Sequence, residues 1–132
     1  MHDTRIHVRW GELDPYNHVN HSTYLSYLEH GRIDALDRIG WGMDKLASDG
    51  FQVVVARADV RFRKPATAGD DLIVRTWVIE TRAASTVWGQ RILRGDEIIV
   101  EAEITAAATT LAGRPTRIPA EFRDAMGTLL AP

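Results

Sequence analysis

Titratable and carboxamide side chains are concentrated in one stretch near the start of the chain. Its sequence is Asp14-Pro15-Tyr16-Asn17-His18-Val19-Asn20-His21. Directly after it, residues 22–39 carry apolar side chains at helical spacing. The first N–H groups of a helix have no partner within it and carry the positive end of its dipole. A carboxylate and a site that stabilises developing negative charge can therefore lie side by side, so we interpret this stretch as the candidate active site.

Asp14 is the candidate general base or nucleophile. A carboxylate just before a proline is often only a turn residue, but the neighbouring His18, His21 and helix start favour catalysis, because perturbed titrating groups concentrate in functional sites. Either histidine could instead be a hydrogen-bonded loop residue. A metal site built from these three side chains is disfavoured, because the histidines are three positions apart in a turn and not four apart on a helix. Asn17 and Asn20 are expected to be turn and cap residues.

The rest of the chain must position this stretch. The helix at 22–39 should begin at an N-cap, Asn20, and end at Gly40. Leu25, Leu28 and Leu36 should form its buried stripe. Strands are expected at 5–10, 51–64, 72–81, 86–94 and 98–111, with further helical turns at 43–49 and 118–126. Short connections such as Gly95-Asp96 imply antiparallel neighbours, so the pattern predicts an α+β domain spanning residues 1–132, with a five-stranded antiparallel sheet packed on one long helix.

Several side chains have a structural and a functional interpretation. Tyr24 is expected to pack in the core or to line a cleft. Glu29 should pair with Arg32 three positions on, or act as a second candidate carboxylate. The strand at 51–64 should alternate throughout, with Val54, Ala56, Ala58, Val60 and Phe62 on one face and Arg57, Asp59, Arg61 and Arg63 on the other. The four tryptophans are expected in the core or in an interface.

Composition restricts the class of protein. The chain has 132 residues, no cysteine and a formal net charge of −2. A thiol nucleophile and disulfides are therefore absent, and nothing indicates binding to nucleic acid or to an anionic membrane. No signal peptide is visible, and no apolar run is long enough to span a bilayer. These features predict a soluble cytoplasmic protein.

A longer pattern resembles a known family. It runs Trp10-x-x-x-Asp14-x-x-x-His18-Val19-Asn20-x-x-x-Tyr24-x-x-x-x-Glu29-x-x-Arg32. This is similar to the acyl-CoA thioesterases of the hotdog fold, in particular the 4-hydroxybenzoyl-CoA thioesterase and YbgC-like group. The similarity is dense over residues 9–36. Asn17 stands where glycine is usual, and asparagine tolerates the left-handed conformation that glycine would supply.

The resemblance implies an acyl-CoA thioesterase, a homodimer or homotetramer, without metal or organic cofactor. It assigns the role of base or nucleophile to Asp14, and polarisation of the thioester carbonyl to a backbone N–H at His21. Plant acyl-ACP thioesterases place a catalytic histidine in the His-Val-Asn triplet, which corresponds to His18. We expect Asn17, Asn20, Tyr24, Glu29, Arg61 and Arg63 to line the substrate site, with the arginines near the coenzyme A phosphates. Alternatives are an acyl-ACP substrate, or a binding protein without catalysis.

Overall fold

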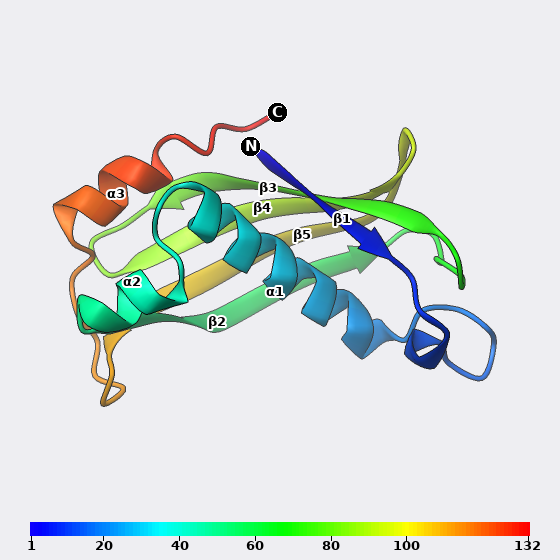
Figure 1. Ribbon diagram of the computed structural model, residues 1–132, viewed down its shortest axis with the longest axis horizontal. Helices are drawn as coiled ribbons and strands as arrows, with labels where there is room; N and C mark the ends of the chain where they lie inside the picture. Colours follow the sequence, from blue (N-terminus) through cyan, green and yellow to red (C-terminus); the bar gives the residue numbers. More distant parts are fainter.

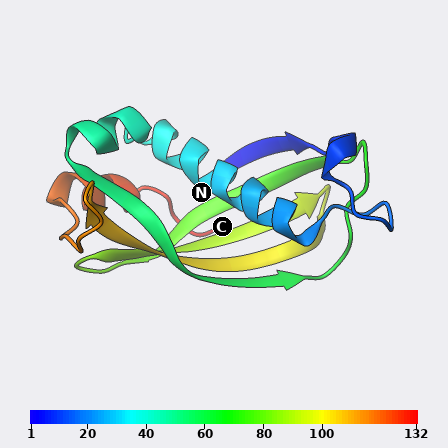
Figure 2. The ribbon, with the colours of Figure 1, turned by 90° about the horizontal axis from the view of Figure 1, so that it is seen from below.

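The computed structural model describes residues 1–132 as one antiparallel sheet with three helices. The elements are β1 (His2–His7), α1 (His21–Arg38), α2 (Met43–Ser48), β2 (Phe51–Phe62), β3 (Asp71–Thr81), β4 (Ser85–Arg94), β5 (Glu97–Thr110) and α3 (Ala120–Met126), with a 3₁₀ turn at Trp10–Glu12. The strand order is β1-β3-β4-β5-β2 (Figure 1). The sheet curves around one face of α1 (Figure 2). The predicted α+β architecture, a five-stranded sheet wrapped on one long helix, is confirmed.

Helix α1 has the predicted cap at each end. The side chain of Asn20 accepts a hydrogen bond from the N–H of Ser22, and Gly40 leaves the helix with φ of 85°. Its buried face differs in part from the predicted stripe. Leu25 is 46% exposed, whereas Tyr24, Tyr27, Leu28, Gly31, Ala35 and Leu36 are buried. The stripe is rotated toward Gly31 because the helix lies very close to the sheet there: a Cβ at Gly31 would lie 2.6 Å from Cγ1 of Val74.

Two apolar clusters fill the space between α1 and the sheet. One contains Trp41, Phe51, Trp88 and Phe122, and packs the C-terminal end of α1 with α2 and α3. The other contains Val19, Tyr24, Leu28, Leu72 and Val100, and packs the N-terminal half of α1. Because the second cluster includes Val19, the candidate active-site loop rests directly on the core.

The first strand is shifted relative to its prediction. It covers His2–His7, not residues 5–10, because β3, the strand with which it pairs, begins at Asp71 opposite His7. Beyond that point the chain leaves the sheet, and Trp10 is 86% exposed in the 3₁₀ turn. Of the two positions expected for the tryptophans, Trp10 does not occupy the core, and its place in an interface stays a prediction.

Strand β2 does not alternate along its whole length as predicted. The register with β5 shifts between Val55 and Arg57, which marks a bulge. Phe51 and Val53 pack on the core before the bulge, and Val60 packs on it after the bulge. The core-packing face therefore changes from odd to even positions, and Val54 does not pack on the core.

Three further local predictions are confirmed. The segment at 43–49 forms α2, the segment after Pro119 forms α3, and Gly95-Asp96 joins β4 to β5 as a two-residue turn with φ of 59° at Gly95. None of the helices has the length and apolar character that crossing a membrane requires.

Candidate active site

The Asp14 side chain builds the loop in which it lies. Its Oδ1 accepts hydrogen bonds from the backbone N–H groups of Tyr16 (2.8 Å) and His18 (3.1 Å). Its own N–H donates to the carbonyl oxygen of His18 over 2.7 Å. Asn17 adopts φ of 62°, as its expected turn role requires. The loop is therefore closed by Asp14 itself.

The second carboxylate oxygen of Asp14 has no hydrogen-bond partner in the chain. Backbone N–H groups restrain one oxygen while the other stays available, and the side chain is only half-buried. A carboxylate held in this way can accept a proton from water or attack an acyl carbon without first breaking an internal bond.

The N-terminus of α1 directly follows this loop. His21 is the first residue of the helix, so its N–H has no acceptor within the helix. Its ring packs edge-on against Phe62 at 4.9 Å between centroids, and Phe62 also lies 5.5 Å from the ring of Tyr24. Phe62 is 45% exposed and was not predicted to belong to the site, although an aromatic residue closing β2 before Pro65 was a visible signal.

His18 contributes its backbone to the site. Its N–H and carbonyl oxygen both bond to Asp14, whereas its ring is exposed and makes no hydrogen bond within the chain. Asp14, His18 and His21 do not form a group that could hold a metal ion.

Glu12, just before the loop, links it to the helix. Its carboxylate accepts hydrogen bonds from the N–H of Arg9 and the hydroxyl of Tyr27, both over 2.8 Å. Burial raises the pKa of Glu12, but these hydrogen bonds outweigh it and hold the pKa below its ordinary value. Burial and the nearby Glu12 carboxylate raise the pKa of Tyr27. The sequence did not single out this pair because its members are far apart along the chain.

Tyr24 is buried, and its hydroxyl accepts a hydrogen bond from the N–H of Ala66 over 2.9 Å. Burial raises its pKa. Of its two expected positions, core or cleft, Tyr24 occupies the core.

An apolar groove of about 580 Å³ lies between α1, α2 and β2. Its walls include Leu36, Leu46, Val55 and Trp88, and two charged residues of α1, Glu29 and Arg32, also line it. The predicted ion pair between Glu29 and Arg32 is not formed. Arg32 instead donates from Nη1 to Oε1 of Gln90 over 2.9 Å, because Gln90 offers a buried acceptor directly beneath the helix. Burial lowers the pKa of Arg32, and Glu29 partly opposes this.

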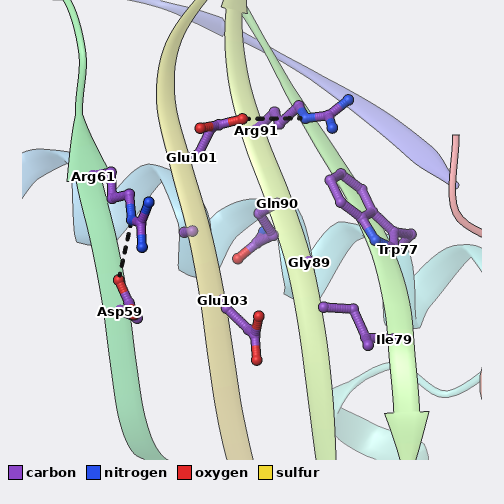
Figure 3. A pocket seen from close by; sticks show the side chains of 10 residues that line it. Asp59, Arg61, Trp77, Ile79, Gly89, Gln90, Arg91, Glu101 and Glu103 are labelled. Atoms are coloured by element: carbon purple, nitrogen blue, oxygen red, sulfur yellow. Dashed lines mark ion pairs between the residues drawn. The ribbon is translucent and has the colours of Figure 1, made fainter.

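Arg61 and Arg63 lie on the face of the sheet that points away from α1. Arg61 makes a loose ion pair with Asp59 at 4.0 Å, beside a shallow hollow of about 240 Å³ (Figure 3). Arg63 is tightly paired with Glu101, to which Nε donates over 2.6 Å. No residue from 14 to 21 lines this hollow. One chain therefore brings together Asp14, Asn17, His18, Asn20 and His21, but not these arginines.

The sheet wrapped around a helix, with a carboxylate loop before that helix, is the arrangement predicted for hotdog-fold thioesterases. The family model of the thioesterase-like superfamily matches residues 8–126. The chain therefore belongs to this superfamily, and the predicted resemblance is confirmed.

Individual relatives carry thioesterase names. The chain is 32% identical to the chloroplastic acyl-acyl carrier protein thioesterase ATL3 of Arabidopsis thaliana, over 94% of this chain and 66% of the plant protein. It thus spans about two thirds of that relative's length. It is 31% identical to the long-chain acyl-CoA thioesterase FadM of Escherichia coli, over 77% of this chain and 78% of FadM. A solved structure of a probable thioesterase from Bartonella henselae superposes with a TM-score of 0.86 at 29% identity, covering 89% of this chain and 98% of that one.

Proposed function

We propose that this protein hydrolyses acyl-CoA thioesters to a free carboxylic acid and coenzyme A. Asp14 acts as general base or nucleophile, and the N-terminus of α1 at His21 polarises the thioester carbonyl. The observation that carries the proposal is the state of the Asp14 carboxylate. One oxygen is held by two backbone N–H groups and the other is free, in the loop that leads into the longest helix of the chain.

The chemistry requires a base and an oxyanion site close together. Hydrolysis needs water activated, or a carboxylate that attacks, while donors stabilise the negative charge that develops on the carbonyl oxygen. The free oxygen of Asp14 suits the first task. The N–H of His21 suits the second, because it combines an unpaired donor with the positive end of the helix dipole. The His21 ring packs on Phe62, which supports a backbone role for this residue.

The groove between α1 and β2 suits the acyl group. Its lining is mostly apolar, and burying apolar surface stabilises a complex by about 25 cal/mol for each Å² removed from water. Glu29 lies on its wall and remains the second candidate carboxylate. Asn17 and Asn20 shape the loop that precedes α1, so we propose that they contact the substrate through the loop backbone that they hold.

The nucleotide part of coenzyme A requires a second chain. Arg61, and more weakly Arg63, are proposed to meet its phosphates in a homodimer or homotetramer, across an interface that brings the Asp14 loop of one subunit to the β2 strand of another. Arg61 is the better candidate, because Arg63 is already neutralised by Glu101. The open edge of β2 supports such an assembly, since exposed edges pair readily.

Acyl-ACP is the second candidate substrate, favoured by the similarity to the plant acyl-ACP thioesterase and by the His-Val-Asn triplet. The test is a panel of acyl-CoAs and the matching acyl-ACPs with a free-thiol readout. Turnover of acyl-CoA supports the proposal, and turnover of acyl-ACP alone supports the alternative. Failure to hydrolyse any thioester, with binding retained, would favour a non-catalytic acyl-thioester binding protein.

A further inference from the structure

The buried hydroxyl of Tyr24 holds a residue that in turn holds the active-site loop. Tyr24 is 3% exposed, and its Oη accepts the N–H of Ala66 over 2.9 Å. The carbonyl oxygen of the same Ala66 accepts the N–H of Val19 over 2.8 Å. Ala66 is fully buried and Val19 is 2% exposed, so water does not compete for either bond. A single residue, Ala66, thus connects the Tyr24 hydroxyl to the loop.

Beyond the packing of Val19 on the core, the loop makes few other hydrogen bonds to the rest of the chain. The hydrogen bonds that Asp14 accepts from Tyr16 and His18 fix its internal shape but not its position on the helix and sheet. Outside Val19, its backbone is tied by the N–H of Asn20, which donates to the carbonyl oxygen of Glu12 over 2.9 Å. The Asn20–Glu12 bond connects the loop to the 3₁₀ turn, and the Val19–Ala66 bond connects it to the turn between β2 and β3.

The turn between β2 and β3 is itself firmly held. Arg94 donates to the carbonyl oxygen of Pro65 over 3.1 Å and to the Asp70 carboxylate over 2.8 Å. Asp70 also accepts the N–H of Thr67 over 2.9 Å. These contacts make the turn a fixed support, and Tyr24 joins that support to α1.

We propose that Tyr24 is a positioning residue, which sets the place of Asp14 relative to the first turn of α1 through Ala66 and Val19. This inference rests on the proposed function of Asp14. Without the phenol, the N–H of Ala66 would be buried without an acceptor, which is unfavourable, and the tie between α1 and the turn would be lost. Val19, which is bonded to the turn, would then shift relative to α1, and the Asp14 carboxylate would leave its place in the loop before the helix.

The test is Tyr24→Phe, which removes only the hydroxyl. We expect kcat to fall roughly tenfold to a hundredfold, since a displacement of about 1 Å costs on the order of 10² in rate. KM should change by less than about threefold, because the hydroxyl is buried and bonded to Ala66. The matched control is Thr110→Val at the end of β5, which likewise removes a hydroxyl that accepts a backbone N–H, that of Arg114 over 3.2 Å, but outside the Asp14 loop, and it should leave kcat unchanged.

Hydrogen exchange of backbone amides supplies a readout independent of activity. In the wild type, the amides of Ala66 and Val19 should exchange slowly, and Tyr24→Phe should accelerate both while the β3–β4 amides stay protected. Unchanged kcat, or a rise in KM alone, would overturn the positioning role. If the variant does not fold, a wild-type Val19 amide that exchanges as fast as that of Tyr16 would overturn it, and a slow one would support it. An active Asp14→Asn variant refutes the proposed function instead, and the exchange measurement still decides whether Tyr24 holds the loop.

Discussion

The side-chain amide of Gln90, in the middle of β4, donates a hydrogen bond to the backbone carbonyl oxygen of Leu28 in α1 over 2.9 Å. Gln90 is 1% exposed and also donates to Thr76 and accepts from Arg32. Because all its partners lie in the core or at its edge, Gln90 fixes where α1 sits along the sheet. The start of the same helix forms the candidate active site, so this network also positions the site.

Gln90→Leu should therefore destabilise the fold. It leaves Thr76 and Arg32 without their partner, and unsatisfied buried groups cost about 1–3 kcal/mol each, more when charged. We expect the free energy of unfolding to fall by roughly 2–4 kcal/mol in urea denaturation. The control is Gln52→Leu, on the partly exposed β2, where the side chain makes no hydrogen bond and the change should stay within about 0.5 kcal/mol. Equal effects of the two substitutions would show that the network does not matter.

Asp14→Asn should lower kcat by at least about a hundredfold, because base catalysis contributes roughly 10²–10⁴ in rate. The amide oxygen can still accept the N–H groups of Tyr16 and His18, so the loop and the melting temperature should be preserved. Glu29→Gln, on the wall of the groove, is the matched carboxylate control and should retain most activity. The opposite ranking in a steady-state free-thiol assay would transfer the catalytic role to Glu29.

Local features of this fold could be predicted from the sequence, and features set by distant contacts could not. The Asn20 cap and the Gly95-Asp96 turn depend on a few neighbouring residues, and both predictions are confirmed. The Glu29–Arg32 pair was also a local expectation, but Arg32 prefers Gln90, 58 positions away. The bulge in β2 depends on its pairing with β5, and the end of β1 before Trp10 depends on its pairing with β3. The sequence of one strand does not show with which strand it will pair.

The candidate site divides in the same way. The cluster from Asp14 to His21 was readable because it is contiguous, and its loop geometry follows from Asp14 and Asn17. Phe62 and Ala66 come to the loop from the end of β2 and the turn after it, and only the folded chain brings them there. The catalytic roles themselves stay predictions.

His21→Ala should retain most activity if the residue acts through its N–H. The substitution keeps the backbone donor and removes only a ring that packs on Phe62. A loss comparable to that of a general acid or base, about 10² or more in kcat, would instead assign a proton-transfer role to the ring. His18→Ala is the partner experiment, and its exposed ring should also be dispensable. A pH–rate profile whose acid limb disappears in His18→Ala would contradict this.

Acid should weaken the tie between β1 and α1 that Asp34 makes. Its Oδ2 accepts hydrogen bonds from the Thr4 hydroxyl (2.6 Å) and from Nε2 of His2 (2.8 Å). These bonds, the Thr4 bond foremost, hold the pKa of Asp34 below its ordinary value of 3.8, although burial opposes them. A carboxyl whose pKa is lower in the folded than in the unfolded state stabilises the folded protein at any pH above its unfolded-state pKa. This contribution is lost as the pH falls through the folded-state pKa.

Asp34→Asn should accordingly destabilise the protein near pH 7, and the difference from the wild type should shrink steadily once the pH drops below about 4. Urea denaturation at several pH values measures this. Asp37→Asn, on the same helix but with an exposed carboxylate that accepts no hydrogen bond, should change stability little throughout. A wild-type advantage that persists undiminished at strongly acid pH would contradict the assignment.

The open edge of β2 leads to the last prediction, that the active protein is an oligomer. β2 is an edge strand of 12 residues, and three of its apolar side chains are 40–50% exposed, namely Val54, Val55 and Phe62. A long apolar edge in a lone domain invites pairing, and pairing with a second copy would also bring Arg61 toward another subunit's Asp14 loop. Sedimentation at micromolar concentration should therefore give two or four times the 14.8 kDa of one chain.

Val55→Lys, which puts a charge on that edge, should yield monomers and abolish turnover together. Leu130→Lys, at a 69% exposed position near the C-terminus, should do neither. A Val55→Lys monomer that hydrolyses acyl-CoA at the wild-type rate would refute the shared site, whatever the role of Asp14.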